Sequence, residues 1–113
     1  PVIKDAMRLS PIYPDWFLSE LARACFQTGR YDDAVEVLEW RLRNDPNSGE
    51  ALILLAASQS AAGRPEKAKV ALARFLAPRP AYTLGHYASG EFYKKAEDLN
   101  RVLDALRKAG LPE

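Results

Sequence analysis

The sequence predicts an all-α fold built from antiparallel helix hairpins stacked one on the next. The first observation is a repeat, because TGRYDDAVEVLEWRLRNDP at 28–46 returns 34 residues later as AGRPEKAKVALARFLAPRP at 62–80. The second is that apolar residues recur at three- and four-residue spacing, which marks one face of a helix. The third is that Gly29 and Gly63 interrupt the two copies at the same place.

The first repeat unit covers residues 15–48 and contains two helices. Gly29 ends the first helix, because glycine adopts positive φ at a helix end without a steric penalty. The second helix runs from about Asp32 to Asn44, with acidic residues at its start, and Pro46 closes it. The apolar positions of the two helices are Leu18, Leu21, Ala22, Cys25, Ala34, Val35, Leu38 and Leu42.

The second unit covers residues 49–82 and repeats this pattern. Pro65 opens its second helix, where proline fits because the first turn needs no N–H donor. Small alanines recur in both units where the two helices of a hairpin must approach closely. These alanines are Ala22, Ala34, Ala56 and Ala68, and the leucines beside them are Leu38 and Leu72.

Both ends of the chain are less regular than these two units. Residues 1–11 match the back half of a preceding second helix, so we expect a fragment of a longer protein. Residues 83–113 predict a degenerate third unit that ends in an amphipathic capping helix with a charged outer face. Its register stays open: one alternative uses Gly90, Tyr93, Val102 and Leu106, and the other uses Leu84, Tyr87, Ala88 and Glu91.

The pattern L-x-x-L-A-x-x-C … A-x-x-x-L … P at 18–46, with its copy at 52–80, resembles the tetratricopeptide repeat. This resemblance implies a right-handed superhelix, a non-catalytic role in protein–protein interaction, and a concave surface lined by the first helix of each unit. Residues 92–113 also resemble the C-terminal end of bacterial class III nucleotide cyclase-like proteins that carry such repeats. The second resemblance implies a regulatory or dimerising tail, and it brings none of the cyclase's catalytic positions into this chain.

Composition argues against several other classes of protein. The formal net charge is +1, without the basic excess by which nucleic-acid binders neutralise phosphates. The longest apolar run, at 51–57, is much shorter than a membrane span, and the start of the chain does not look like a signal peptide. The single cysteine favours a reducing compartment, so we expect a cytoplasmic protein. Because Cys25 and His86 lie two units apart, we expect no catalytic pair. One His and one Cys cannot make a typical zinc set, so we expect no metal site, and we expect no cofactor.

The concave groove is the candidate binding site for a protein or peptide partner. Its lining is mostly aromatic or apolar, which suits an amphipathic helix or an apolar peptide. The lining residues are Trp16, Ser19, Arg23, Phe26, Gln27, Glu50, Ile53, Ala57, Tyr82 and Phe92, with Tyr93 in place of Phe92 in the other register. The asparagine and lysine with which some family members grip a chaperone's C-terminal carboxylates are missing from these positions. Alternatively, the aromatic residues pack between hairpins, or the last helix fills the groove.

Val37 and Trp40 form a candidate self-association surface, because Trp40 lies off the buried stripe of its helix. The alternative is that Trp40 is partly buried by a neighbouring helix or by residues 1–7. We therefore expect a non-catalytic interaction module for a peptide, a partner protein or a sister subunit. The second hypothesis is a regulatory or dimerising tail of a cyclase-like enzyme. A third, RNA binding through basic residues such as Arg41 and Arg74, is disfavoured because acidic neighbours weaken the positive field.

Overall fold

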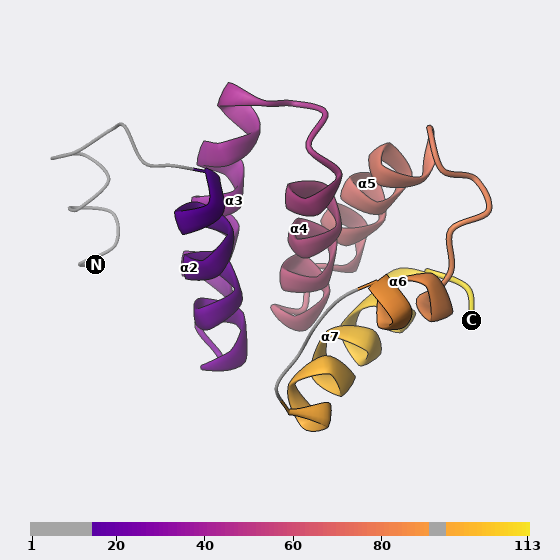
Figure 1. Ribbon diagram of the computed structural model, residues 1–113. Coiled ribbons are helices and arrows are strands. Elements are labelled where there is room, and N and C mark those ends of the chain that lie inside the picture. The colour runs from indigo at the N-terminus through magenta and orange to yellow at the C-terminus, as the bar shows by residue number, and fades with distance from the viewer. Residues whose placement is uncertain (1–14, 91–94) are drawn as a thin grey trace, which may run out of the picture.

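The protein is all-α over residues 15–90 and 95–113, which are the residues that the computed structural model describes. This confirms the predicted fold class of a helical-repeat superhelix. The helices are α2 (Asp15–Gln27), α3 (Tyr31–Asn44), α4 (Gly49–Ala61), α5 (Pro65–Leu76), α6 (Leu84–Gly90) and α7 (Ala96–Ala109). Figure 1 shows α2 with α3 at one end of the molecule, α4 with α5 beside them, and α6 with α7 at the other end. The predictions for residues 1–11 fall outside the described residues.

Helix α4 is the centre of the structure. It packs between α3 and α5, and α7 covers a further side (Figure 1). All of the residues from Ala51 to Gln59 are buried. A helix that is apolar or small on every side is stable only when neighbouring elements cover it all round. The other helices are therefore arranged around α4.

Three helices of the chain end in the same glycine turn. Gly29, Gly63 and Gly110 have φ values of 79°, 83° and 112°, in the left-handed region that favours glycine. The residue after each glycine donates its N–H to the carbonyl five residues earlier, which is the Schellman arrangement. These bonds are Arg30 N to Cys25 O at 2.8 Å, Arg64 N to Gln59 O at 2.9 Å, and Leu111 N to Leu106 O at 3.0 Å. The glycines thus end the helices and reverse the chain.

The alanines that the sequence marks as contact positions are buried between helices. Ala34 and Ala68 are the fourth residues of α3 and α5 and are fully buried. Leu38 and Leu72 lie one turn further along in the same core. A methyl group at these positions lets two helix backbones come close while the leucines fill the remaining space. The repeated small–large pattern therefore sets the close packing of α2 with α3 and of α4 with α5.

The third unit departs from the hairpin pattern of the first two. Leu84 and Tyr87 are buried while His86 and Ser89 are exposed, so α6 follows the shifted register. In α7, Val102 and Leu106 are buried, which is what the strict 34-residue register predicts for these two positions. Helix α7 packs mainly on α4 and less on its own neighbour α6, whereas α5 packs most closely on its partner α4. The two helices of this unit are therefore displaced relative to the repeat.

We expect Gly29→Ala to lower the free energy of unfolding by about 1 kcal/mol, because alanine is strained at positive φ. The space around Gly29 is open, so the cost comes from the backbone alone. Urea unfolding followed by circular dichroism measures it. Gly85→Ala is the control, because Gly85 is helical and an added Cβ meets only Thr83 Oγ1 at an ordinary 3.6 Å. Equal losses in both variants would contradict this account of the turn.

Candidate protein-interaction groove

One end of the groove holds a polar cluster that joins α2, α3 and α4. We call Ser19, Arg23, Arg41 and Glu50 the Glu50 cluster. The Ser19 hydroxyl donates to Glu50 Oε1, and Arg23 Nη2 lies 3.2 Å from Glu50 Oε2. Arg41 Nη2 lies 3.8 Å from Glu50 Oε1. One carboxylate on α4 thereby holds side chains from both helices of the first unit.

The Glu50 cluster is tied to the beginning of α4. Ser48 is the N-cap residue, and its hydroxyl accepts a hydrogen bond from Ala51 N at 3.3 Å and another from Arg41 Nη1. Burial acts to raise the pKa of Glu50, but the hydrogen bond from Ser19 and the charges of Arg23 and Arg41 outweigh it, so the pKa lies below its usual value. Glu50 therefore stays ionised within the fold.

The next stretch of the groove is apolar at the equivalent positions. Ile53, Ala57, Phe75 and Leu84 stand 34 residues after the four members of the Glu50 cluster, and each is at most 4 % exposed. An interface that is ionic between the first and second units thus becomes hydrophobic between the second and third. The candidate groove residues Ile53 and Ala57 belong to this buried part.

Helix α7 packs against α4, the helix that carries Ile53 and Ala57. Its apolar face is buried, and the members of that face are Val102, Ala105, Leu106 and Ala109. At its start, Gln27 Nε2 donates to the carbonyl oxygen of Asp98 at 3.0 Å, and Arg101 Nη1 donates to Gln27 Oε1 at 3.2 Å. Helix α7 therefore reaches from the end of α2 across α4 to α6. Gln27 is thus a candidate groove residue that α7 contacts, and the alternative that the last helix fills the groove stays a prediction.

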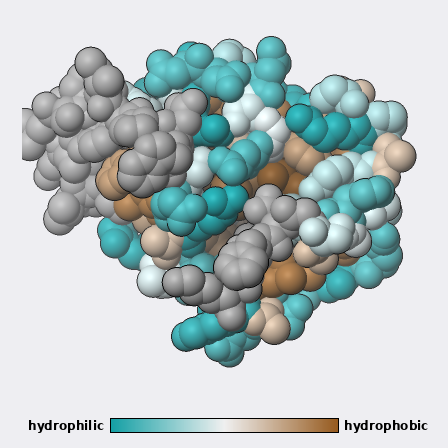
Figure 2. Space-filling model, viewed as in Figure 1, coloured by the Kyte–Doolittle hydropathy of each residue, from teal (hydrophilic) through white to brown (hydrophobic). Residues whose placement is uncertain are grey.

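A small pocket remains where α7 meets the first hairpin. It has a volume of about 230 Å³ and is lined by Phe26, Tyr31, Ala61, Arg101, Asp104, Ala105 and Lys108. Phe26 is buried and packs edge-on against Tyr31, with 5.3 Å between the ring centroids. Figure 2 shows hydrophobic surface toward the middle of the face on which α2 and α7 lie, with hydrophilic residues around it. This face is amphipathic even with α7 in place.

Of the remaining candidate groove residues, Tyr82 lies beside Phe75, and the other two cannot be placed. Tyr82 packs edge-on against Phe75 at 4.8 Å between centroids and lies 5.5 Å from the His86 ring, between α5 and α6. Phe92 and the side chain of Trp16 lie outside the described residues. The structure therefore brings Ser19, Arg23 and Glu50 together and joins Gln27 to α7.

Sequence reasoning missed Arg41 and the α7 residues Asp98 and Arg101. The repeat did carry a signal for Arg41. An arginine stands in the first unit at the position where the second unit has Phe75, and replacement of an aromatic residue by a charged one indicates a different contact. No pattern indicated Asp98, since it contributes a backbone carbonyl, which every residue possesses.

The candidate self-association surface needs a correction. Val37 has no exposed surface, so its predicted place on the outward side of α3 is wrong. The physical reason is that α3 packs on both α2 and α4, which widens its buried face. Trp40 is partly buried against the core, and Arg43 Cζ lies 5.7 Å from the centroid of its ring. Of Val37 and Trp40, only Trp40 has exposed surface.

The titratable residues show structural roles. Cys25 is buried, and burial raises the pKa of its thiol, which keeps the thiol in its less reactive protonated form. His86 Nδ1 is within 3.0 Å of the Thr83 hydroxyl at the beginning of α6. Over residues 15–90 and 95–113, no group of three or more His, Cys, Asp or Glu side chains is placed to hold a metal ion. No helix in the same residues is long and apolar enough to cross a membrane.

These observations define a helical-repeat protein made of stacked helix hairpins. Two models of the tetratricopeptide repeat match the chain, over residues 15–58 and 49–74. The chain belongs to the tetratricopeptide repeat family. No curated protein matches it. Tetratricopeptide repeats generally mediate protein–protein interactions and are typically non-catalytic.

We expect Glu50→Gln to lower the free energy of unfolding by about 1 kcal/mol at neutral pH, because Arg41 and Arg23 lose their shared carboxylate. The pKa of Glu50 is lowered in the fold, so this stabilisation is present above its ordinary value of 4.5 and is lost as the pH falls through the folded pKa. The difference between wild type and variant should therefore shrink in acid. Urea unfolding from neutral pH to well below 4.5 measures this.

Glu66→Gln is the matched control for this experiment. Glu66 is the second residue of α5, as Glu50 is the second residue of α4, and it is exposed. Both variants remove an acidic residue from the positive end of a helix, so the control isolates the Glu50 cluster. A loss in Glu66→Gln as large as that in Glu50→Gln would show that the cluster contributes nothing beyond the helix dipole.

Proposed function

We propose that this chain is a protein-interaction module whose groove along α2 and α4 receives an amphipathic helix. The observation that carries this proposal is α7 itself, an amphipathic helix from the same chain that lies against α4 and contacts Gln27. A groove that fits one such helix has the shape and chemistry to fit another of similar pattern. Protein–protein interaction is the general role of the family.

The chemistry of the groove specifies the partner helix further. Ile53 and Ala57 offer an apolar floor, so the partner needs apolar side chains at the spacing of Val102, Leu106 and Ala109. Gln27 offers a side-chain amide N–H that donates to a backbone carbonyl oxygen near the beginning of the bound helix. Acidic residues in the first turn and basic residues in the last, as in α7, would complete the match.

A partner helix must compete with α7, which is covalently attached. Attachment gives α7 an effective concentration on the order of millimolar at the groove. A free helix with the same contacts therefore binds weakly to the wild-type chain and more tightly once α7 is displaced. The affinity for a free helix should therefore differ measurably between the chain with α7 in place and the chain with α7 displaced.

We expect Leu106→Glu to increase the affinity of the full chain for a fluorescein-labelled peptide of residues 96–113 by about tenfold or more. Leu106 has no exposed surface, so a charge there expels α7 from the groove. Fluorescence anisotropy measures the binding, and circular dichroism checks that the remaining helices persist. Asn100→Glu is the control, because Asn100 is on the exposed face of α7 and should leave binding at the wild-type level.

The milder variant Leu106→Ala tests the same proposal if Leu106→Glu does not fold. It removes most of the buried side chain without burying a charge, so the peptide should again bind more tightly than to wild type, by a smaller factor. A folded variant that binds the peptide no better than Asn100→Glu would overturn the proposal.

A second candidate is a regulatory or dimerising tail of a cyclase-like enzyme. It is supported by the resemblance of residues 92–113 and by the exposed part of the Trp40 ring. Under this proposal, light scattering should give twice the mass of the chain as concentration rises, and Trp40→Gln should restore the monomer mass. Val70→Gln is the control, because Val70 is an exposed hydrophobic residue on α5. A monomer at every concentration would exclude dimerisation through this chain.

A further inference from the structure

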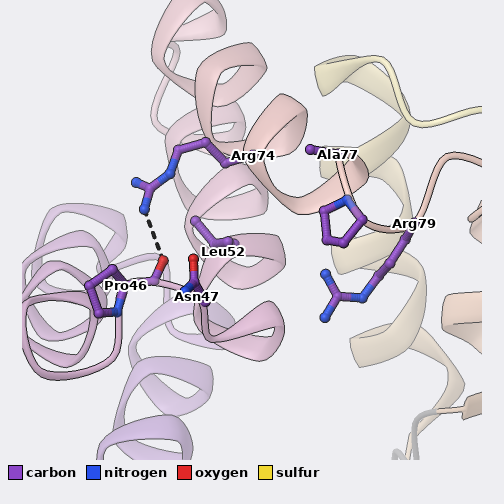
Figure 3. Close-up of a pocket in the computed structure, with 7 residues that line it drawn as sticks. Pro46, Asn47, Leu52, Arg74, Ala77 and Arg79 are labelled. Carbon is purple, nitrogen blue, oxygen red and sulfur yellow. Dashed lines mark hydrogen bonds between the residues drawn. The ribbon is translucent and has the colours of Figure 1, made fainter.

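A second pocket lies away from the groove, between two loops. It has a volume of about 650 Å³, and its lining comes from the α3–α4 loop, the first half of α4, and the end of α5 with the loop that follows. The lining residues are Pro46, Asn47, Leu52, Arg74, Ala77, Pro78 and Arg79 (Figure 3). None of these residues lines the pocket beside α7. This site is therefore separate from the proposed helix-binding groove.

Two arginines of this pocket are held in place by backbone carbonyls. Arg74 Nη2 donates to the carbonyl oxygen of Pro46 at 2.9 Å, across the pocket from α5 to the preceding loop. Arg79 Nη1 donates to the carbonyl oxygen of Phe75 at 3.0 Å, and its Cζ stacks 4.6 Å from the centre of the Phe75 ring. Each guanidinium is thus oriented by a hydrogen bond to a backbone carbonyl.

Neither guanidinium pairs with a carboxylate among residues 15–90 and 95–113. A guanidinium carries five N–H donors, so each arginine keeps donors after bonding one carbonyl. In the view of Figure 3, the two guanidinium groups lie on either side of Leu52 and Asn47. Leu52 thus lies between the two positive charges in this view, and Pro46 and Ala77 add apolar side chains to the lining.

We propose that this pocket binds an acidic segment of a partner protein, in which one apolar side chain sits between two carboxylates. The apolar side chain would enter over Leu52, and one carboxylate would pair with each arginine. Charge complementarity carries this proposal, because the described lining of the pocket holds two cations and no anionic side chain. The net charge of +1 favours a short acidic segment over an extended polyanion.

The test is a titration of the ¹⁵N-labelled full chain with the tripeptide acetyl-Glu-Leu-Glu-amide, followed by amide and arginine Nε resonances. We expect saturable shifts at Asn47, Leu52 and both pocket arginines. Arg74→Gln and Arg79→Gln should each weaken binding about fivefold. Lys69→Gln is the control, because it removes one positive charge from the exposed face of α5 outside this pocket and should leave binding unchanged.

Gly49→Ala provides a test that leaves the net charge unchanged. A Cβ at Gly49 would lie 2.5 Å from Arg79 Nη2, so the guanidinium must move aside, which a flexible side chain can do without unfolding the protein. Binding should weaken about as much as in Arg79→Gln. The peptides acetyl-Gln-Leu-Gln-amide and acetyl-Glu-Gly-Glu-amide should both bind more weakly than the parent peptide.

Three results would overturn the proposal. The first is an absence of shifts at the pocket, and the second is an equal loss in Lys69→Gln, which would indicate an unspecific charge effect. The third is inorganic phosphate competing as well as the tripeptide, which would indicate a simple anion site. Because the probe and the variants leave Gln27 and α7 unchanged, none of these results bears on the groove.

Discussion

Helix α4 has to be covered on all sides, and the positions of the other helices follow from that requirement. From Ala51 to Gln59 it has no exposed face. The hairpin partner α5 and the preceding helix α3 cover two sides, as the repeat dictates. In a longer array the first helix of another unit would cover more of α4. Here α6 spans seven residues, and α7 supplies most of the remaining cover instead.

The contrast between the two unit interfaces follows from the same constraint. Between the first and second units, Glu50 accepts from Ser19 and pairs with Arg23, so that interface has an ionic component with directional geometry. Between the second and third units, the equivalent positions are buried and apolar. Hydrophobic contact is non-directional, so it tolerates a helix that crosses α4 in a new orientation. The ionic interface does not tolerate a new orientation, because a shifted α2 would leave the partly buried carboxylate of Glu50 without its partners.

The sequence was sufficient to predict the two hairpins, their glycine turns and the repeated alanines and leucines of their cores. These features depend on local signals, such as Gly29 at a helix end and alanines at close contacts, and the 34-residue period repeats each signal once. The place of α7 could not be predicted in the same way. Its periodicity showed that Val102 and Leu106 would be buried, but an apolar stripe does not state which surface it will meet. Val37 was misplaced for a related reason, because a single stripe was assumed for a helix that packs on two neighbours.

The apolar character of Ile53 and Ala57 has two consequences that oppose each other. Under the proposed function it makes the groove attractive to a partner helix, and for the same reason the uncovered groove would be costly in water. The affinity for any partner is therefore a difference, namely the free energy of its own contacts minus that of the contacts of α7 with α4 and Gln27. A partner that merely equals α7 cannot displace it at ordinary concentrations, because α7 is attached. Selectivity then requires a contact that α7 lacks, and the free face of the partner helix, turned toward the hydrophilic rim, is the place where such a contact can form.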